Sequence, residues 1–428
     1  MIKGNLFAKA DGEKIRIYFI QRGDASEAPN LPVKVYRRLA DEINFSTGMC
    51  GDDPGHWTEY VDNQKYTDER VSTVFDGTLP IKNSFCYYLD EDASIGHTYL
   101  YWVTQQSAHG EIVIGPTACK LRDPNVWWGY DRSIAEMECL AQQYPEFVQT
   151  CTYGESTMHR KLMGLQIGNS ERTLLVAGAI HASEPGPEII LKAVRFILEN
   201  RPELLDEVGI KIFPTVNVDI REQTVQGEPF YLRKNANGVD LNRNFDWDWR
   251  EEFVYGFSNA DPESSTYHGP YPASENETQA AVKFVKESIH PLALFVFDSN
   301  SVITEDHFLF GSEPGEACWE RDNELANIYS HAFRENHEGC GSFTAEPMHY
   351  PKKLHACFDG TGQPHGTFEG WVHHNYQIPA YSLQTAYSKE GLCNSTDTVS
   401  LERLNQWARR HAYALMAMLE EFSVKETV

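Results

Sequence analysis

Residues 173–200 read TLLVAGAIHASEPGPEIILKAVRFILEN. The apolar run at 173–180 has the length of a buried strand, and the segment at 187–200 has the apolar spacing of a helix. His181 and Glu184 lie between them, directly after the strand. Open α/β sheets bind their ligands at the carboxyl ends of strands. The stretch therefore predicts an α/β domain with a polar site at one strand end.

The sequence around this stretch alternates between apolar runs and helical patterns. A helical pattern begins with SIAEMECLAQQYPEFV at 133–148 and opens a second domain. This alternation predicts an α/β fold with a mixed, mostly parallel sheet flanked by helices. The further strands are expected at 210–216, 292–298, 307–311 and 380–385, and the further helices at 276–288, 316–336 and 400–422.

The region before residue 125 has a different period. Runs such as KIRIYFI at 14–20 alternate apolar and polar residues, which is typical of antiparallel β-structure. Its last part, GHTYLYWVTQQSAHGEIVIGPTACKL, resembles the final two strands of a fibronectin type III module. Pro124 and the tryptophans after it mark a junction. We therefore expect a smaller all-β sandwich at 1–124 and the α/β domain at 125–428.

Composition narrows the range of partners. The 428 residues include 37 Lys and Arg against 62 Asp and Glu, a net charge of −25. This charge repels phosphate backbones and anionic lipids, so we expect neither nucleic acid nor a membrane as a partner. Nine scattered cysteines without a C-x-x-C pair, and an N-terminus without the features of a signal peptide, predict reduced thiols and a cytoplasmic protein. The β module carries no residues with catalytic character and is a possible surface for a protein partner.

The pair His181 and Glu184 forms an H-x-x-E motif. An imidazole nitrogen and a carboxylate are both accepted zinc ligands. The motif is weak by itself, since His56 and Glu59 repeat it inside the β module. Its position at a strand end distinguishes the first copy.

Several blocks accompany the pair in a fixed order. They are YPEFVQTCTYGES at 144–156, HASE, RKN, GVDLNRNF at 238–245, HGPYPASENETQAAVKFV at 268–285 and IPAYSLQTAY at 378–387. Over about residues 133–420 this order resembles the zinc carboxypeptidase family, the carboxypeptidase A-like metallopeptidases. The resemblance implies one Zn²⁺ with His181 and Glu184 as its first two ligands. It also implies that Asn242 and Arg243 bind the terminal carboxylate of a substrate and that Arg233 stabilises the oxyanion. A guanidinium suits both tasks, because it binds a carboxylate with two donors and stabilises developing negative charge.

The third ligand departs from the family pattern. The resemblance places a His where LALFVFDSNS, at 292–301, carries Asp298. Asp can ligate zinc, but a second carboxylate neutralises more of the ion's charge and makes other divalent metals conceivable. His307, nine residues further on, is an open alternative source of the missing imidazole.

The residue at the position of the general base also departs from the family pattern. The strand block AYSLQT carries Gln384 where the family has Glu, and an amide cannot accept the proton of an attacking water. The nearest carboxylates in the sequence that could act as the base instead are Glu305, Asp306 and Glu390.

Glu369 is a separate candidate, for the choice of substrate. It precedes Trp371 near the family's specificity pocket, where a carboxylate would favour a C-terminal Lys or Arg.

Together these features predict a metal-dependent carboxypeptidase-type hydrolase. Its substrate would be a peptide or related amide with a free C-terminal carboxylate. The alternative is a non-catalytic protein of the same fold that binds C-terminal carboxylates without cleaving them.

Overall fold

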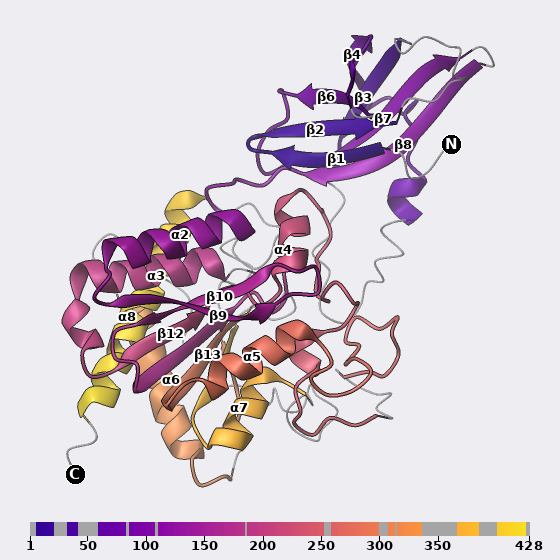
Figure 1. Cartoon of the computed structure of the whole chain (residues 1–428). Coiled ribbons are helices and arrows are strands. Elements are labelled where there is room, and N and C mark those ends of the chain that lie inside the picture. The colour runs from indigo at the N-terminus through magenta and orange to yellow at the C-terminus, as the bar shows by residue number, and fades with distance from the viewer. Residues whose placement is uncertain are drawn as a thin grey trace.

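The structure is a computed structural model that describes residues 6–20, 32–41, 59–82, 85–107, 110–184, 186–251, 258–298, 307–312, 315–335, 366–384 and 400–424. Within these residues the strands form two small antiparallel sheets and one larger sheet. Figure 1 shows the two small sheets as a module at one end of the molecule, next to the larger sheet and its helices.

The N-terminal module is a β-sandwich. One sheet has the order β1-β2-β6-β5 and the other β4-β3-β7-β8. Lettered along the chain, these orders read ABED and C′CFG, the arrangement of immunoglobulin-like sandwiches. The buried side chains of Ile15, Ile17, Tyr101 and Val103 meet in the core between the sheets. The strands are β1 (Leu6–Asp11), β2 (Lys14–Phe19), β3 (Val33–Leu39), β4 (Ser72–Gly77), β5 (Ile81–Lys82), β6 (Phe85–Asp90), β7 (Thr98–Ser107) and β8 (Gly110–Lys120).

The larger sheet is mixed, as predicted. Its order is β14-β15-β13-β11-β12-β10-β9. The four central strands, from β15 to β12, run parallel, whereas β14, β10 and β9 join antiparallel to their neighbours. The strands are β9 (Val148–Glu155), β10 (Lys161–Ile167), β11 (Arg172–Gly178), β12 (Gly209–Phe213), β13 (His290–Asp298), β14 (His307–Phe310) and β15 (Ala380–Gln384).

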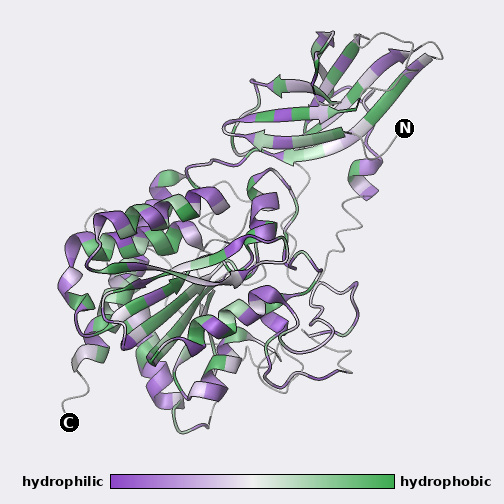
Figure 2. Cartoon of the chain, viewed as in Figure 1, coloured by the Kyte–Doolittle hydropathy of each residue, from purple (hydrophilic) through white to green (hydrophobic). Residues whose placement is uncertain are grey.

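Helices cover both faces of this sheet. Leu174 and Val176 of β11 pack into the cluster that contains α2, α3, α6 and α8, whereas Leu175 and Ala177 pack into the cluster with α5 and α7. Both faces of a central strand are thus buried, which is why such strands are continuously apolar; Figure 2 shows the hydrophobic central strands. The helices are α2 (Tyr130–Gln143), α3 (Pro187–Asn200), α4 (Val218–Val225), α5 (Asn276–Lys286), α6 (Trp319–Arg334), α7 (Phe368–Tyr376) and α8 (Leu401–Val424), with short 3₁₀ turns at η1 (Pro202–Leu205) and η2 (Leu241–Arg243).

The predicted elements agree with the structure except at one helix end and in some short elements. The helix expected over 133–148 ends at Gln143, and the chain continues into β9 at Val148. Pro145 explains the early end, because proline lacks the N–H that a helix interior needs. Several elements were not predicted, since none of them carries a long periodic run; they are β1, β4, β5, β9, β10, α4 and α7.

The two modules are in contact through the loop after α4. The amides of Ala10 and Lys120 donate to the carbonyls of Gln226 and Gly227, each at 2.8 Å. Arg122 donates from Nη1 to the carbonyl of Thr224 at 2.6 Å. These bonds fix both β1 and the end of β8 against the α/β domain.

In the described part of the chain, no helix combines the length and the apolar character that crossing a membrane requires. The cysteines described there, Cys86, Cys119, Cys139, Cys151 and Cys318, are free thiols. The cytoplasmic location stays a prediction.

Candidate metal centre and carboxylate-binding residues

The loop between β11 and α3 carries the H-x-x-E pair. Ala179 adopts a left-handed φ of 46°, which turns the chain sharply after the strand. A Cβ at Gly186 would lie 2.7 Å from the Ala179 nitrogen and 3.0 Å from the Pro214 carbonyl oxygen. Only glycine therefore allows the start of α3 to pack this closely against the strand end. The fold brings His181 and Glu184 back over the edge of the sheet.

Asp298 joins this pair from the end of the neighbouring strand. β11 and β13 are parallel, and Gly178 pairs with Phe297, so the two strands end side by side. Nδ1 of His181 lies 3.1 Å from Oε1 of Glu184 and 3.2 Å from Oδ1 of Asp298. All three side chains are at least nine-tenths buried. The structure thus brings together the three predicted ligands, within 4.8 Å of one another.

Asp240 holds His181 from the other side of the ring. Its Oδ1 lies 3.1 Å from Nε2 of His181, and its Oδ2 accepts a bond of 2.7 Å from Nε of Arg233. A carboxylate on the distal nitrogen is the usual partner of a metal-ligating histidine, because it fixes the orientation of the ring. Sequence reasoning did not assign this role, although Asp240 lies inside GVDLNRNF, two residues before Asn242.

Two hydroxyl groups complete the surroundings of the carboxylates. Tyr231 donates from its hydroxyl to Oε1 of Glu184, and Ser382 donates to Oδ2 of Asp298 at 3.2 Å. Neither was predicted from sequence. Tyr231 lies two residues before Arg233, and Ser382 lies two residues before Gln384 on β15. These bonds hold the carboxylate groups in the orientation in which they face His181.

The protonation of the cluster follows from its buried charges. Burial and the charge of Arg233 lower the pKa of His181, but Glu184 and Asp298 outweigh them and raise it well above its ordinary value. Burial, helped by Asp298, raises the pKa of Glu184 to about 8. Burial opposes ionisation of Asp298 too, yet its bonds with Glu184 and His181 hold that pKa below its usual range. Binding of a metal cation by these groups would therefore be coupled to the release of protons.

The expected carboxylate-binding residues lie next to this cluster. Asn242 and Arg243 belong to η2, and both are nearly fully buried. The Asn242 side-chain oxygen accepts a bond of 2.8 Å from the amide of Phe368, which ties η2 to the start of α7. Burial lowers the pKa of Arg243, while Asp240 opposes that shift.

The guanidinium group of Arg233 is hydrogen-bonded at one of its nitrogens, among the described residues, but not at another. Its Nε bonds to Asp240, whereas its Nη1 is buried without a hydrogen-bond partner among the described residues. Its charge acts on both His181 and Glu184. A guanidinium nitrogen is therefore available to an anionic group beside the cluster.

Glu369 lies on α7 and is completely buried. Neither of its carboxylate oxygens meets a donor with hydrogen-bond geometry among the described residues. Burial, together with the charge of Asp298, raises its pKa to about 7, and Arg243 opposes this shift. The structure therefore places a buried carboxylate, stabilised by the Thr367 hydroxyl, within electrostatic range of Asp298 and Arg243.

The backbone of Gln384 lies at the same edge of the sheet. Its Cα pairs with those of Asp298 on β13 and His307 on β14. The side chains of Gln384 and His307 lie outside the described residues, as do Glu305, Asp306 and Glu390. The roles predicted for these residues stay predictions.

Known proteins with similar sequences are carboxypeptidases. Rat mast cell carboxypeptidase A is 26% identical over 39% of this chain and 44% of its own length. The catalytic chain of mouse carboxypeptidase N is 27% identical over 50% of this chain and 54% of its own. The chain therefore spans about half the length of the curated relatives it matches.

Solved structures share the fold of the larger domain. Bovine thrombin-activatable fibrinolysis inhibitor, solved in complex with tick carboxypeptidase inhibitor, superposes with a TM-score of 0.55 at 18% identity. The match covers 70% of this chain and 98% of that one. Carboxypeptidase A from Helicoverpa armigera gives a TM-score of 0.54 at 17% identity, over 68% of this chain and 74% of that one. The family model of zinc carboxypeptidases matches residues 133–407, which is more than half of the sequence. The chain belongs to the zinc carboxypeptidase family.

Proposed function

We propose that this protein is a metal-dependent carboxypeptidase-type hydrolase that removes the C-terminal residue of a peptide or related amide. The observation that carries the proposal is the buried cluster of His181, Glu184 and Asp298, with one imidazole nitrogen about equally far from two carboxylates. An arrangement of this kind is costly without a cation, because buried carboxylates must otherwise be protonated or paired.

The donor set fits zinc. The nitrogen and the two oxygens are ligand types that zinc accepts, and Asp240 supplies the outer carboxylate that orients a ligating histidine. Zinc bound by these three residues would act as a Lewis acid on the carbonyl group of the bond to be cut. The same donors would also hold other divalent ions of the first transition series.

The neighbouring arginines can bind the two negative charges of the reaction. Arg243, with Asn242 beside it, is suited to hold the substrate's terminal carboxylate, since a guanidinium binds a carboxylate with two parallel donors. Arg233 has a donor without a partner at Nη1, which can stabilise the oxygen that becomes negative in the transition state. Neither of these two roles requires the chain to change its fold.

The side chain removed by the reaction is proposed to be basic. Glu369 is a completely buried carboxylate without an ion pair of short distance among the described residues, and its charge acts on Arg243. A Lys or Arg side chain that reached Glu369 would satisfy this carboxylate. An acidic side chain would be repelled.

Two features predict slow hydrolysis. Asp298 adds a second negative charge to the metal site, and Gln384 lacks the basic oxygen that takes a proton from water. The loss of a general base lowers rates by about 10² to 10⁴-fold. A non-catalytic binding protein that retains Asn242 and Arg243 is therefore the second candidate.

The test compares a peptide that ends in lysine with the same peptide amidated at its C-terminus. Calorimetric titration of the zinc-loaded protein should give tighter binding of the free acid, and mass spectrometry should detect released lysine that disappears after chelation. Arg243→Ala should weaken binding of the free acid by about 2 to 4 kcal/mol, because it leaves the carboxylate without its partner. Arg250→Ala is the control, since Arg250 is exposed and pairs with Asp248.

Equal affinity of the two peptides would refute the role of Arg243. Binding of the free acid without release of lysine, at full zinc occupancy, would favour the non-catalytic alternative.

A further inference from the structure

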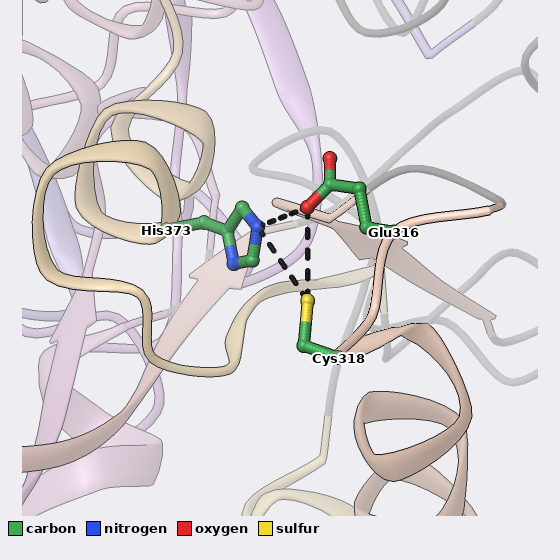
Figure 3. A group of neighbouring side chains, drawn as sticks. All are labelled: Glu316, Cys318 and His373. Carbon is green, nitrogen blue, oxygen red and sulfur yellow. Dashed lines mark hydrogen bonds and ion pairs between the residues drawn. The ribbon is translucent and has the colours of Figure 1, made fainter.

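A second group of metal-ligand side chains lies between α6 and α7. Glu316 and Cys318 come from the turn that begins α6, and His373 comes from the last turn of α7 (Figure 3). The side chain of His373 is 4% exposed and that of Glu316 is 41% exposed, so the group reaches from the interior to the surface. None of these residues has a role in the proposed hydrolysis.

The three ligand atoms lie at distances that suit one ion. Nε2 of His373 is 2.7 Å from Oε2 of Glu316 and 3.8 Å from Sγ of Cys318, and Sγ is 3.6 Å from the same Oε2. Zinc bonds of usual length at tetrahedral angles separate their ligand atoms by about 3.3 to 3.6 Å. Only the nitrogen–oxygen pair must separate, by roughly half an ångström to one ångström. That pair is held close because the two atoms now share a hydrogen bond.

His373 is oriented as a metal ligand is. Its Nδ1 lies 3.1 Å from the carbonyl oxygen of Ile378, to which an Nδ1–H group can donate. That bond leaves Nε2 facing Glu316 and Cys318. A backbone carbonyl on the distal nitrogen is a common way of fixing the ring of a ligating histidine.

Asp322 provides an independent observation at the same place. It lies on the first turn of α6 and is 1% exposed, and the only side-chain donors that stabilise its charge among the described residues are the hydroxyl of Ser312 and the thiol of Cys318. Its charge acts on His373 and on Cys318. Burial raises the pKa of Asp322, and the pKa of the Cys318 thiol rises to about 11 through burial and the charges of Asp322 and Glu316. A buried carboxylate without an ion-pair partner costs stability that a nearby cation would recover.

An ordinary ion pair between His373 and Glu316 explains less. It accounts for the 2.7 Å contact, but it gives no reason for a thiol at 3.8 Å from the imidazole or for a second, buried carboxylate that acts on both. A divalent cation accounts for all four groups. The thiol further selects the kind of cation, since sulfur ligands favour zinc-like ions over magnesium or calcium.

We propose that Glu316, Cys318 and His373 form a second, zinc-class metal site that joins the start of α6 to α7, with Asp322 as the neighbouring carboxylate that balances or completes it. The site does not depend on hydrolysis at His181. It would, however, fix α7, which also carries Glu369 one helical turn before His373.

The test uses Co²⁺ as a spectroscopic probe on the full chain after removal of bound metal with a chelator. Among the described residues the cluster at His181 has no sulfur ligand, so a thiolate-to-cobalt charge-transfer band in the near ultraviolet distinguishes the group with Cys318 from the cluster at His181. We expect the unmodified protein to show this band, and Cys318→Ser to lose it together with one equivalent of bound metal. Cys139→Ser is the matched control, because Cys139 is a partly buried thiol on α2, and it should keep the band.

His181→Ala separates this proposal from the proposed function, since it should abolish hydrolysis and one metal equivalent but keep the band. His373→Gln should weaken cobalt binding at the second site at least tenfold, as judged by the band, and it provides a second route if Cys318→Ser does not fold. A band that survives in Cys318→Ser, or cobalt binding to the unmodified protein without any such band, would overturn the proposal.

Discussion

Asp298 is the residue with the largest consequence for the chemistry of the site. With Glu184 it brings two carboxylates to one imidazole, so a divalent ion bound there would have its charge fully neutralised. A neutral site polarises a carbonyl group less than one that keeps positive charge. Ser382, which donates to Asp298, holds the carboxylate in this position rather than leaving it free to turn away.

Restoring both departures from the family pattern should raise activity. Asp298→His returns positive charge to the site, and Gln384→Glu supplies a base at the end of the neighbouring strand. The double variant should hydrolyse a lysine-ending peptide at least about tenfold faster in kcat/KM than the unmodified protein. The two single variants, with metal content measured in each, separate the contributions. A double variant slower than an already active parent would show that Asp298 itself takes part in the reaction.

Glu369 is predicted to set the preference for the removed side chain. Glu369→Gln removes the negative charge and keeps the shape, so kcat/KM for peptides ending in Lys should fall about 10 to 100-fold relative to those ending in Leu. Steady-state assays with peptides that differ only in the last residue measure this ratio. An unchanged ratio, or a preference of the unmodified protein for acidic ends, would exclude Glu369 from the pocket.

At the scale of elements, α8 packs against α3 and α6 on one face of the sheet, and the contact contains a buried histidine. His411 is fully buried, and its Nδ1 lies 2.8 Å from the hydroxyl oxygen of Tyr329 on α6, within hydrogen-bond distance. Its ring lies among aromatic groups, with centroid distances of 4.5 Å to Phe297 and 4.8 Å to Phe333. Burial, together with the charge of Arg410, lowers the pKa of His411 to about 3.

This histidine should make the stability of the α/β domain depend on pH. The pKa of His411 is lower in the folded state than the unfolded value of about 6.5, so acid favours unfolding. The stabilising effect is complete above about pH 6.5 and is lost as the pH falls from there toward the folded value. Between pH 6.5 and pH 5, protonation of His411 in the unfolded state should lower the free energy of unfolding by about 1.5 kcal/mol.

Urea unfolding at several pH values measures this dependence. His411→Gln should be less stable at neutral pH, through lost packing, but its stability should fall less steeply below pH 6.5. The exposed His290 supplies the control, and His290→Gln should keep the slope of the unmodified protein. Parallel slopes for the unmodified protein and His411→Gln would contradict the prediction.

At the scale of the whole molecule, one glycine allows the two modules to approach each other. Gly227 has a φ of 110°, and a Cβ there would lie 2.4 Å from Sγ of Cys119 at the end of β8. The junction residues Trp127 and Trp128 are also buried in the core of the α/β domain, and the Arg221 guanidinium lies 5.0 Å from the centre of the Trp127 ring. The sandwich is therefore held by packing as well as by its hydrogen bonds, and in Figure 1 it lies next to α4.

Gly227→Ala should loosen this contact, because the added methyl group clashes with Cys119 and takes up an unfavourable backbone conformation. Limited proteolysis should then cut between the modules faster than in the unmodified protein. Gly238→Ala is the matched control, since Gly238 has a φ of 76° but no atom within 4 Å of the position of the new methyl group. Equal cleavage of the two variants would mean that only backbone strain, and not contact between the modules, was lost.

The sequence by itself determined the elements with strong local patterns. The apolar run and the helix around His181 were located correctly as β11 and α3, because a strand buried on both faces and a one-sided helix have distinct periods. The motifs also identified the candidate residues His181, Glu184, Asn242 and Arg243, and the family to which they point is the one that the comparisons support.

Only the tertiary structure decided which groups meet. Asp240, Tyr231 and Ser382 contact the candidate ligands, but although all three lie within or beside the motif blocks, nothing in the sequence shows which group each of them touches. In the group of Glu316, Cys318 and His373, the histidine lies more than fifty residues from the other two, and the helix α7 that carries it was not predicted. Local patterns record how each segment folds, whereas hydrogen bonds and buried charges between distant segments arise from the packing of the sheet and its helices, so they could be assigned only from the folded chain.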